Sequence, residues 1–287
     1  MKIEIIDLYA HFNIPRDGAE AGFLKVMIAD DTAKNIVKPR SRPGLLICPG
    51  GGYGFVSPRE GEPIALKFLA QGFNSYILDY SVSKRYPTHL IECALAVLYL
   101  RQNCDEVQLI GNKLAIMGFS AGAHLACSLS LMAGDKALTQ NPTLKNIAGG
   151  KSLKKLLRPD AQILCYPVIT SKKGYAHVGS FENLTGNDVS LNKKLSLENR
   201  VTKEAPPTFI WHTADDDSVP VFNSLMLATA LSKKGVKYEL HVYGHGAHGL
   251  STGDKTTSVI EPDCSKNLHG WCQTAIDWLI EQDFCID

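Results

Sequence analysis

One short motif constrains this chain most. Residues 118–122 read Gly-Phe-Ser-Ala-Gly, and they stand between a strand-like apolar segment, 113–117, and a helix-like one, 123–131. A G-x-S-x-G motif in this position is typical of a tight turn that exposes a nucleophilic serine hydroxyl. The small residues relieve the crowding of the turn, and the following helix begins with free N–H groups. Ser120 is therefore the candidate nucleophile, and a plain strand-to-helix turn is the alternative.

Strand-like and helix-like segments alternate along most of the chain. The predicted strands cover residues 43–48, 73–80, 113–117, 160–167, 208–213 and 237–243. The predicted helices cover residues 62–71, 87–103, 123–131, 221–234 and 268–281. This alternation predicts an α/β fold with a doubly wound, mostly parallel sheet, as a single domain over 1–287. A leading strand-like segment at 22–29 is expected at an antiparallel edge of the sheet.

Two longer stretches, 134–158 and 168–205, interrupt this alternation. Connections of such length in a compact domain tend to carry function. The second stretch lies between two predicted strands. We expect it to be a small insertion that caps the site, or else a surface excursion without a role.

Composition argues against several functional classes. The 287 residues include 45% hydrophobic and 21% charged residues, and the formal net charge is +1, as in an ordinary globular protein. Neither the charge balance nor the apolar runs favour a nucleic-acid or membrane partner. Because no cluster has metal-ligand spacing, we expect neither a metal nor an organic cofactor.

The eight cysteines show no C-x-x-C spacing, and Cys48, Cys127 and Cys165 fall inside apolar segments. Free cysteine in such segments packs as a small hydrophobic residue. The first residues resemble no export signal. These features predict a reduced, cytoplasmic protein, although a disulfide between Cys264 and Cys272 stays open.

An acid and a histidine follow the serine in the order that this kind of turn requires. Three adjacent aspartates, 215–217, come after the predicted strand 208–213, and His248 comes after the last predicted strand. Asp216 and His248 are about one β–α–β unit apart, which favours both at one edge of the sheet.

Other residues compete for these roles. Asp215 is the alternative to Asp216, and His245 is the alternative to His248. We expect Asp217 in solvent, His124 packed beneath the nucleophile, and His212 hydrogen-bonded in the core.

Several segments resemble the α/β-hydrolase esterases, closest to the bacterial acetyl-esterase and acetylxylan-esterase-like branch. The resemblance is carried by residues 49–53, 160–170, 179–184, 195–199, 207–225 and 246–250. It implies an α/β-hydrolase fold and a catalytic triad of Ser120, Asp216 and His248. In that branch the acid stands four residues before the proline of a D-x-x-V-P run, which is Asp216 here.

The run Pro-Gly-Gly-Gly-Tyr at 49–53 resembles the oxyanion loop of that branch. Gly51 and Gly52, with the N–H of Ala121 after the nucleophile, are therefore expected to form the oxyanion hole. A flexible loop or a phosphate-binding loop is the alternative, although the usual phosphate-loop patterns are missing.

The resemblance implies a serine carboxylesterase acting on small-molecule acyl esters, with acetylated sugars as the expected substrates and a homodimer as the expected assembly. Four tyrosines could stack on a sugar ring, or else pack in the core: Tyr53, Tyr80, Tyr166 and Tyr175. Two alternatives stay open. One is a serine peptidase or amidase of the same fold, and the other is a catalytically silent hydrolase fold that binds a ligand.

Overall fold

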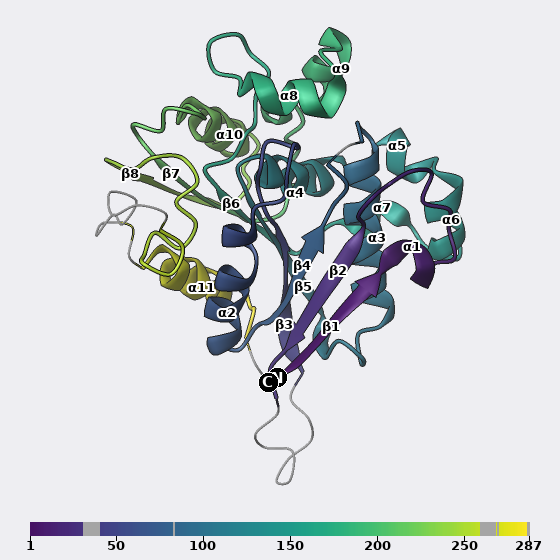
Figure 1. Ribbon diagram of the computed structural model, residues 1–287. Helices are drawn as coiled ribbons and strands as arrows, with labels where there is room; N and C mark the ends of the chain where they lie inside the picture. Colours follow the sequence, from purple (N-terminus) through teal and green to yellow (C-terminus); the bar gives the residue numbers. More distant parts are fainter. Residues whose placement is uncertain (31–40, 83, 259–267, 269, 286–287) are drawn as a thin grey trace.

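In the computed structural model, which describes residues 1–30, 41–82, 84–258, 268 and 270–285, eight strands form one sheet (Figure 1). The strand order is β1-β2-β4-β3-β5-β6-β7-β8. The strands are β1 (Lys2–Asp7), β2 (Phe23–Ile28), β3 (Arg42–Cys48), β4 (Asn74–Asp79), β5 (Leu109–Phe119), β6 (Ala161–Cys165), β7 (Thr208–Thr213) and β8 (Tyr238–Tyr243). The pairs β1–β2 and β2–β4 are antiparallel, and the remaining pairs are parallel. The predicted mostly parallel sheet with an antiparallel edge is confirmed.

The central strands are apolar at successive positions because both faces of the sheet are covered. In β3, Leu45 and Ile47 pack into one hydrophobic core, whereas Leu46 and Cys48 pack into the other. The first core lies under α2 (Glu62–Ala70) and α11 (Trp271–Glu281). The second lies under α3 (Thr88–Gln102), α4 (Ala121–Met132) and α10 (Phe222–Lys233) (Figure 1). Because successive side chains of a strand point to opposite faces of the sheet, alternate residues of β3 pack into different cores.

The two long stretches fold into short helices. The first contains α5 (Lys136–Thr139), α6 (Pro142–Ala148) and α7 (Leu153–Leu157). The second contains α8 (Val178–Thr185), α9 (Val189–Lys194) and the 3-10 helix η2 (Leu197–Asn199). Two further short elements are α1 (Leu8–His11) and η1 (Pro58–Glu60). Figure 1 shows α8 and α9 at the top of the molecule, above the sheet and its flanking helices.

The predicted buried cysteines, Cys48, Cys127 and Cys165, are free and fully buried. Cys264 lies outside the described residues, so the question of a bond to Cys272 stays open. Within the part of the chain that the structure describes, no helix combines the length and apolar character needed to cross a membrane.

Candidate active site

The turn at Ser120 joins β5 to α4 and holds the serine in an unusual backbone conformation. Ser120 has φ 52° and ψ −118°, a region that costs a non-glycine residue energy. A Cβ on Gly118 would lie 2.3 Å from the carbonyl oxygen of Gly122, and one on Gly122 would lie 2.2 Å from that of Pro49. Only glycine fits at either position. The motif therefore reflects a close approach of three backbone segments around the serine.

Three side chains from three sheet-edge loops form one hydrogen-bonded line. His248 Nε2 lies 2.7 Å from Ser120 Oγ, and His248 Nδ1 lies 2.7 Å from Asp216 Oδ2. Asp216 follows β7 and His248 follows β8, so the parallel strands bring both to the edge where β5 ends. The side chain of Asp216 is fully buried, whereas that of His248 is 19% exposed. A hydroxyl, an imidazole and a carboxylate in this order can activate the hydroxyl as a nucleophile.

Asp216 is held in place from several directions. Its Oδ1 accepts hydrogen bonds from the N–H groups of Ser218 at 3.0 Å and Val219 at 2.8 Å. Its Oδ2 also lies 3.2 Å from Nε2 of His212. Burial alone would raise the pKa of Asp216, but the hydrogen bonds from His212, His248 and Val219 and the charge of His248 hold it well below its ordinary value. Asp216 is therefore a stable anion beside the imidazole.

His212 lies in the core, as expected, and makes contacts beyond packing. Its Nδ1 lies 2.7 Å from Ser224 Oγ, and its Nε2 lies 2.8 Å from the carbonyl oxygen of Val219. His212 therefore contacts the carboxylate that bonds His248, and its position inside a strand does not predict this contact.

The alternative residues have other partners. Asp215 Oδ2 lies 3.0 Å from His245 Nδ1, and the His245 side chain is 88% exposed. Asp215 Oδ1 also accepts the N–H of Gly246 at 2.8 Å, so this pair ties two loops together at the surface. Asp217 is exposed. Asp216, and not Asp215, is the carboxylate that contacts His248.

His124 is buried beneath the turn, in α4. Its Nδ1 lies 2.9 Å from the hydroxyl of Tyr53, and its Nε2 lies 2.9 Å from the carbonyl oxygen of Leu195. Burial lowers the pKa of His124 to about 4. The ring is therefore neutral at ordinary pH and links the loop of Tyr53 to the end of the 168–205 insertion.

Residues 49–54 form a loop, here called the glycine loop, directly beside the serine. A Cβ on Gly50 would lie 3.1 Å from Ser120 Cβ. Gly51 has φ 125° and Gly52 has φ 64°. The N–H groups of Gly51, Gly52 and Ala121 have no acceptor among the residues that the structure describes. Such free donors next to a nucleophile can hold a developing oxyanion.

The 168–205 insertion contacts the glycine loop through residues that the sequence analysis missed. Asn183 Nδ2 in α8 donates to the carbonyl oxygen of Gly52 at 2.9 Å. His177, at the start of α8, bonds Ser180 Oγ through Nδ1 at 2.7 Å. Burial lowers the pKa of His177, and the nearby His248 lowers it further. No local spacing marks Asn183, because its partner Gly52 lies 131 residues away in the sequence.

Three of the four tyrosines that could stack on a sugar or pack in the core do the latter. Tyr53, Tyr80 and Tyr166 are each at most 2% exposed and pack in the cores. Tyr175 is partly exposed, and its ring lies tilted against Phe222 at a centroid distance of 4.8 Å. The sequence left both readings open for these tyrosines, because a residue next to a buried strand end can point inward or outward with the same sequence pattern.

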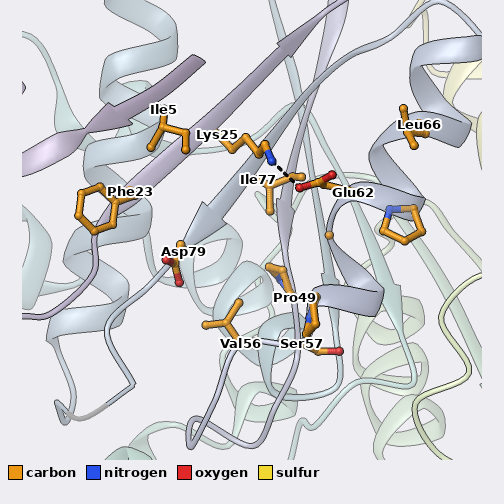
Figure 2. A pocket seen from close by; sticks show the side chains of 13 residues that line it. Ile5, Phe23, Lys25, Pro49, Val56, Ser57, Glu62, Leu66, Ile77 and Asp79 are labelled. Atoms are coloured by element: carbon orange, nitrogen blue, oxygen red, sulfur yellow. Dashed lines mark hydrogen bonds and ion pairs between the residues drawn. The ribbon is translucent and has the colours of Figure 1, made fainter. Parts of the chain in front are cut away.

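A groove of about 900 Å³ is lined by Pro49, at the start of the glycine loop, and by residues of η1, α2, β2 and β4 (Figure 2). Its wall includes the apolar side chains of Ile5, Phe23 and Leu66 and an ion pair between Lys25 and Glu62. None of the three hydrogen-bonded residues at Ser120 lines it. The groove is therefore separate from the reacting groups, despite its size.

Comparisons with known proteins show the family of this chain. A family model described as BD-FAE matches residues 38–231, which is more than half of the chain and includes Ser120 and Asp216. Endo-1,4-beta-xylanase B of Butyrivibrio fibrisolvens is 38% identical over 73% of this chain and 33% of that protein. The acetylxylan esterase of Xylanibacter ruminicola is 28% identical over 71% of this chain and 40% of that protein. The chain thus spans about a third and two fifths of these two relatives.

A solved structure matches nearly end to end. The acetyl ester-xyloside bifunctional hydrolase from Caldicellulosiruptor lactoaceticus superposes with a TM-score of 0.80 and 32% sequence identity, covering 98% of this chain and 97% of that one. Its fold agrees with the sheet and flanking helices described above. The chain therefore belongs to the BD-FAE family, among the esterases of the α/β-hydrolase fold.

Proposed function

We propose that the chain is a serine carboxylesterase that removes short acyl groups, acetyl first, from sugar esters by way of an acyl-enzyme. The observation that carries this proposal is the continuous line from Asp216 through His248 to Ser120, with both hydrogen bonds at 2.7 Å. In this reaction Ser120 Oγ attacks the ester carbonyl, and His248 takes the hydroxyl proton and gives it to the leaving alcohol. Water then repeats the sequence on the acyl-enzyme.

The remaining groups stabilise the charges that develop. Asp216 holds the imidazole in the productive tautomer and stabilises the imidazolium. The N–H groups of Gly51, Gly52 and Ala121 receive the oxyanion, and the loss of one such donor typically costs about 3 kcal/mol of transition-state stabilisation. The glycine loop needs no rearrangement of its own hydrogen bonds to do so, since these N–H groups have no acceptor in the described part of the chain.

The acetyl and sugar preference is supported by the relatives. One is named an acetylxylan esterase and another an acetyl ester-xyloside hydrolase, and the second matches nearly the whole chain. The half-buried His177 and the exposed Asn183 place polar groups of the insertion beside the glycine loop, where a hydroxyl-rich alcohol can find hydrogen-bond partners.

The test is a panel of 4-nitrophenyl acetate, butyrate and octanoate beside an acetylated xylo-oligosaccharide. We expect wild-type turnover to be highest on acetate and to include the sugar ester. We expect Ser120→Ala to abolish turnover while circular dichroism stays unchanged. Ser130→Ala, which removes another buried hydroxyl from the same helix, is the matched control and keeps activity. Turnover by Ser120→Ala at the wild-type rate would overturn the proposal.

The same panel distinguishes the competing enzymes. A 4-nitroanilide substrate should react far more slowly than the ester, and faster amide turnover would favour an amidase. Labelling of Ser120 by a fluorophosphonate checks for a silent fold, because an unactivated serine does not react with that probe.

A further inference from the structure

A buried carboxylate that the proposed reaction does not use lies beside the glycine loop. Glu60, the last residue of η1, is 4% exposed. Its Oε2 accepts the N–H of Gly50 at 2.7 Å, and its Oε1 accepts the hydroxyl of Tyr166 at 2.6 Å. Both oxygens therefore face donors, which is the arrangement of an ionised carboxylate.

Tyr166 carries this contact to the loop of His248. Its hydroxyl oxygen accepts the N–H of Ser251 at 3.0 Å, three residues after His248. Its ring lies edge-on to the His248 ring, with centroids 5.0 Å apart and planes at 72°. Ser251 is itself tied to η1, because its hydroxyl donates to the carbonyl oxygen of Arg59. The Glu60 carboxylate thus connects Gly50, just before the proposed oxyanion donors, through Tyr166 to Ser251, just after His248.

The carboxylate is costly to bury. Burial raises the pKa of Glu60 above its ordinary value, although the hydrogen bonds from Tyr166 and Gly50 and the charges of His248 and Arg59 oppose the shift. The guanidinium of Arg59 is directed elsewhere, to the carbonyl oxygen of Thr257 at 2.6 Å. The titratable and charged neighbours of Glu60 are Arg59, Tyr80, Cys165, Tyr166 and His248. An ionised group without a close cation in such a place is typical of a functional site.

We infer that Glu60 is a positioning residue for this esterase. Its hydrogen bond with Gly50 holds the glycine loop in place, and its hydrogen bond with Tyr166 holds the tyrosine ring that packs against His248. Its negative charge favours the imidazolium that forms when His248 takes the serine proton. This inference rests on the proposed function.

The test is Glu60→Gln, which removes the charge and keeps the size. We expect kcat/KM for 4-nitrophenyl acetate to fall about 10- to 100-fold, and the acid limb of the kcat/KM profile to move to lower pH. The limb moves because the negative charge of Glu60 near His248 is gone, while the carboxylate of Asp216 and the ring of His177 stay in place. The loss of the buried charge should raise the thermal midpoint, whereas the Gln amide NH2, which faces a donor where Glu60 offers an acceptor, should lower it. The acid limb is therefore the readout that decides. Glu62→Gln, on an exposed carboxylate two residues later, is the matched control and changes neither activity nor the limb.

The outcomes separate the two claims. Ser120-dependent turnover in wild type, with Glu60→Gln within twofold and an unmoved acid limb, would overturn the inference and leave the esterase intact. A merely structural role would lower the thermal midpoint without moving the limb, and this also overturns it. Wild type without turnover and with unlabelled Ser120 would instead overturn the proposed function. If Glu60→Gln does not fold, Tyr166→Phe replaces it. We expect this variant to lose kcat/KM about three- to tenfold under conditions in which it stays fully folded, so that the loss does not come from unfolding.

Discussion

Asp216 accepts hydrogen bonds at both carboxylate oxygens and stands between two histidines, only one of which reaches the serine. We expect Asp216→Asn to lower kcat by about 10⁴-fold. The Asn amide can donate to Nδ1 of His248, which leaves the ring proton on Nε2, so that Nε2 cannot accept the proton of Ser120. Initial rates on 4-nitrophenyl acetate, with circular dichroism on the same samples, measure this loss. The contact with His212 is lost as well, so the unfolding midpoint should fall.

The adjacent carboxylate is the natural control. Asp215 pairs with the exposed ring of His245 and with the N–H of Gly246. Because exposed pairs contribute little, Asp215→Asn should keep kcat within about threefold. A loss as large as that in Asp216→Asn would move the assignment of the acid to Asp215.

Helix α8 contributes to the site as an element, through its side-chain contact with the glycine loop. The hydrogen bond from Asn183 to the carbonyl oxygen of Gly52 orients a peptide whose neighbours are the proposed oxyanion donors. We expect Asn183→Ala to reduce kcat/KM about three- to tenfold, which corresponds to the net free energy of one hydrogen bond. Steady-state kinetics on 4-nitrophenyl acetate measure it.

Glu182 offers a matched control on the same helix, because its side chain is exposed. Glu182→Ala should leave kcat/KM unchanged. If both variants lose activity equally, the loss comes from a destabilised α8 rather than from the contact with Gly52. If Asn183→Ala unfolds at the same midpoint as the wild type, a loss of stability does not explain its lower kcat/KM.

At the scale of the whole molecule, what could be predicted followed from local patterns. Ser120, Asp216 and His248 each come directly after an apolar strand segment, and parallel strands end at one edge of a sheet. The mostly parallel sheet, its antiparallel edge and the residues of the hydrogen-bonded line were therefore within reach, whereas the order of the strands was not predicted. Their catalytic roles remain predictions.

What could not be predicted depends on contacts between distant segments. Glu60 meets Tyr166 across 106 residues of sequence, and Asn183 meets Gly52 across 131. Such contacts leave no periodicity, because each joins a single side chain to one group in a distant segment. The inward direction of Tyr53 and Tyr166 stayed open for a related reason, since both have a positive φ that no alternation pattern describes.

The acid sensitivity of the whole fold should depend on buried neutral histidines. His89 in α3 is 1% exposed, lies against the rings of Tyr53 and Tyr80, and has no hydrogen-bond partner for either ring nitrogen among the described residues. Burial lowers its pKa to about 4, below the value of about 6.5 in an unfolded chain. Its contribution to the free energy of unfolding is therefore fully present above pH 6.5 and is lost as the pH falls toward 4. Between pH 8 and pH 5 the loss is about 2 kcal/mol.

We expect His89→Leu to flatten the pH dependence of the unfolding free energy by about that amount, measured by urea unfolding at pH 5, 6, 7 and 8. Part of the slope should remain, because burial also lowers the pKa of His124 to about 4. His245→Gln, at an exposed ring, should keep the wild-type slope. Comparing slopes rather than absolute stabilities separates the titration from any change in packing. An unchanged slope in His89→Leu would mean that this ring finds water or a partner when it takes up a proton in the folded protein.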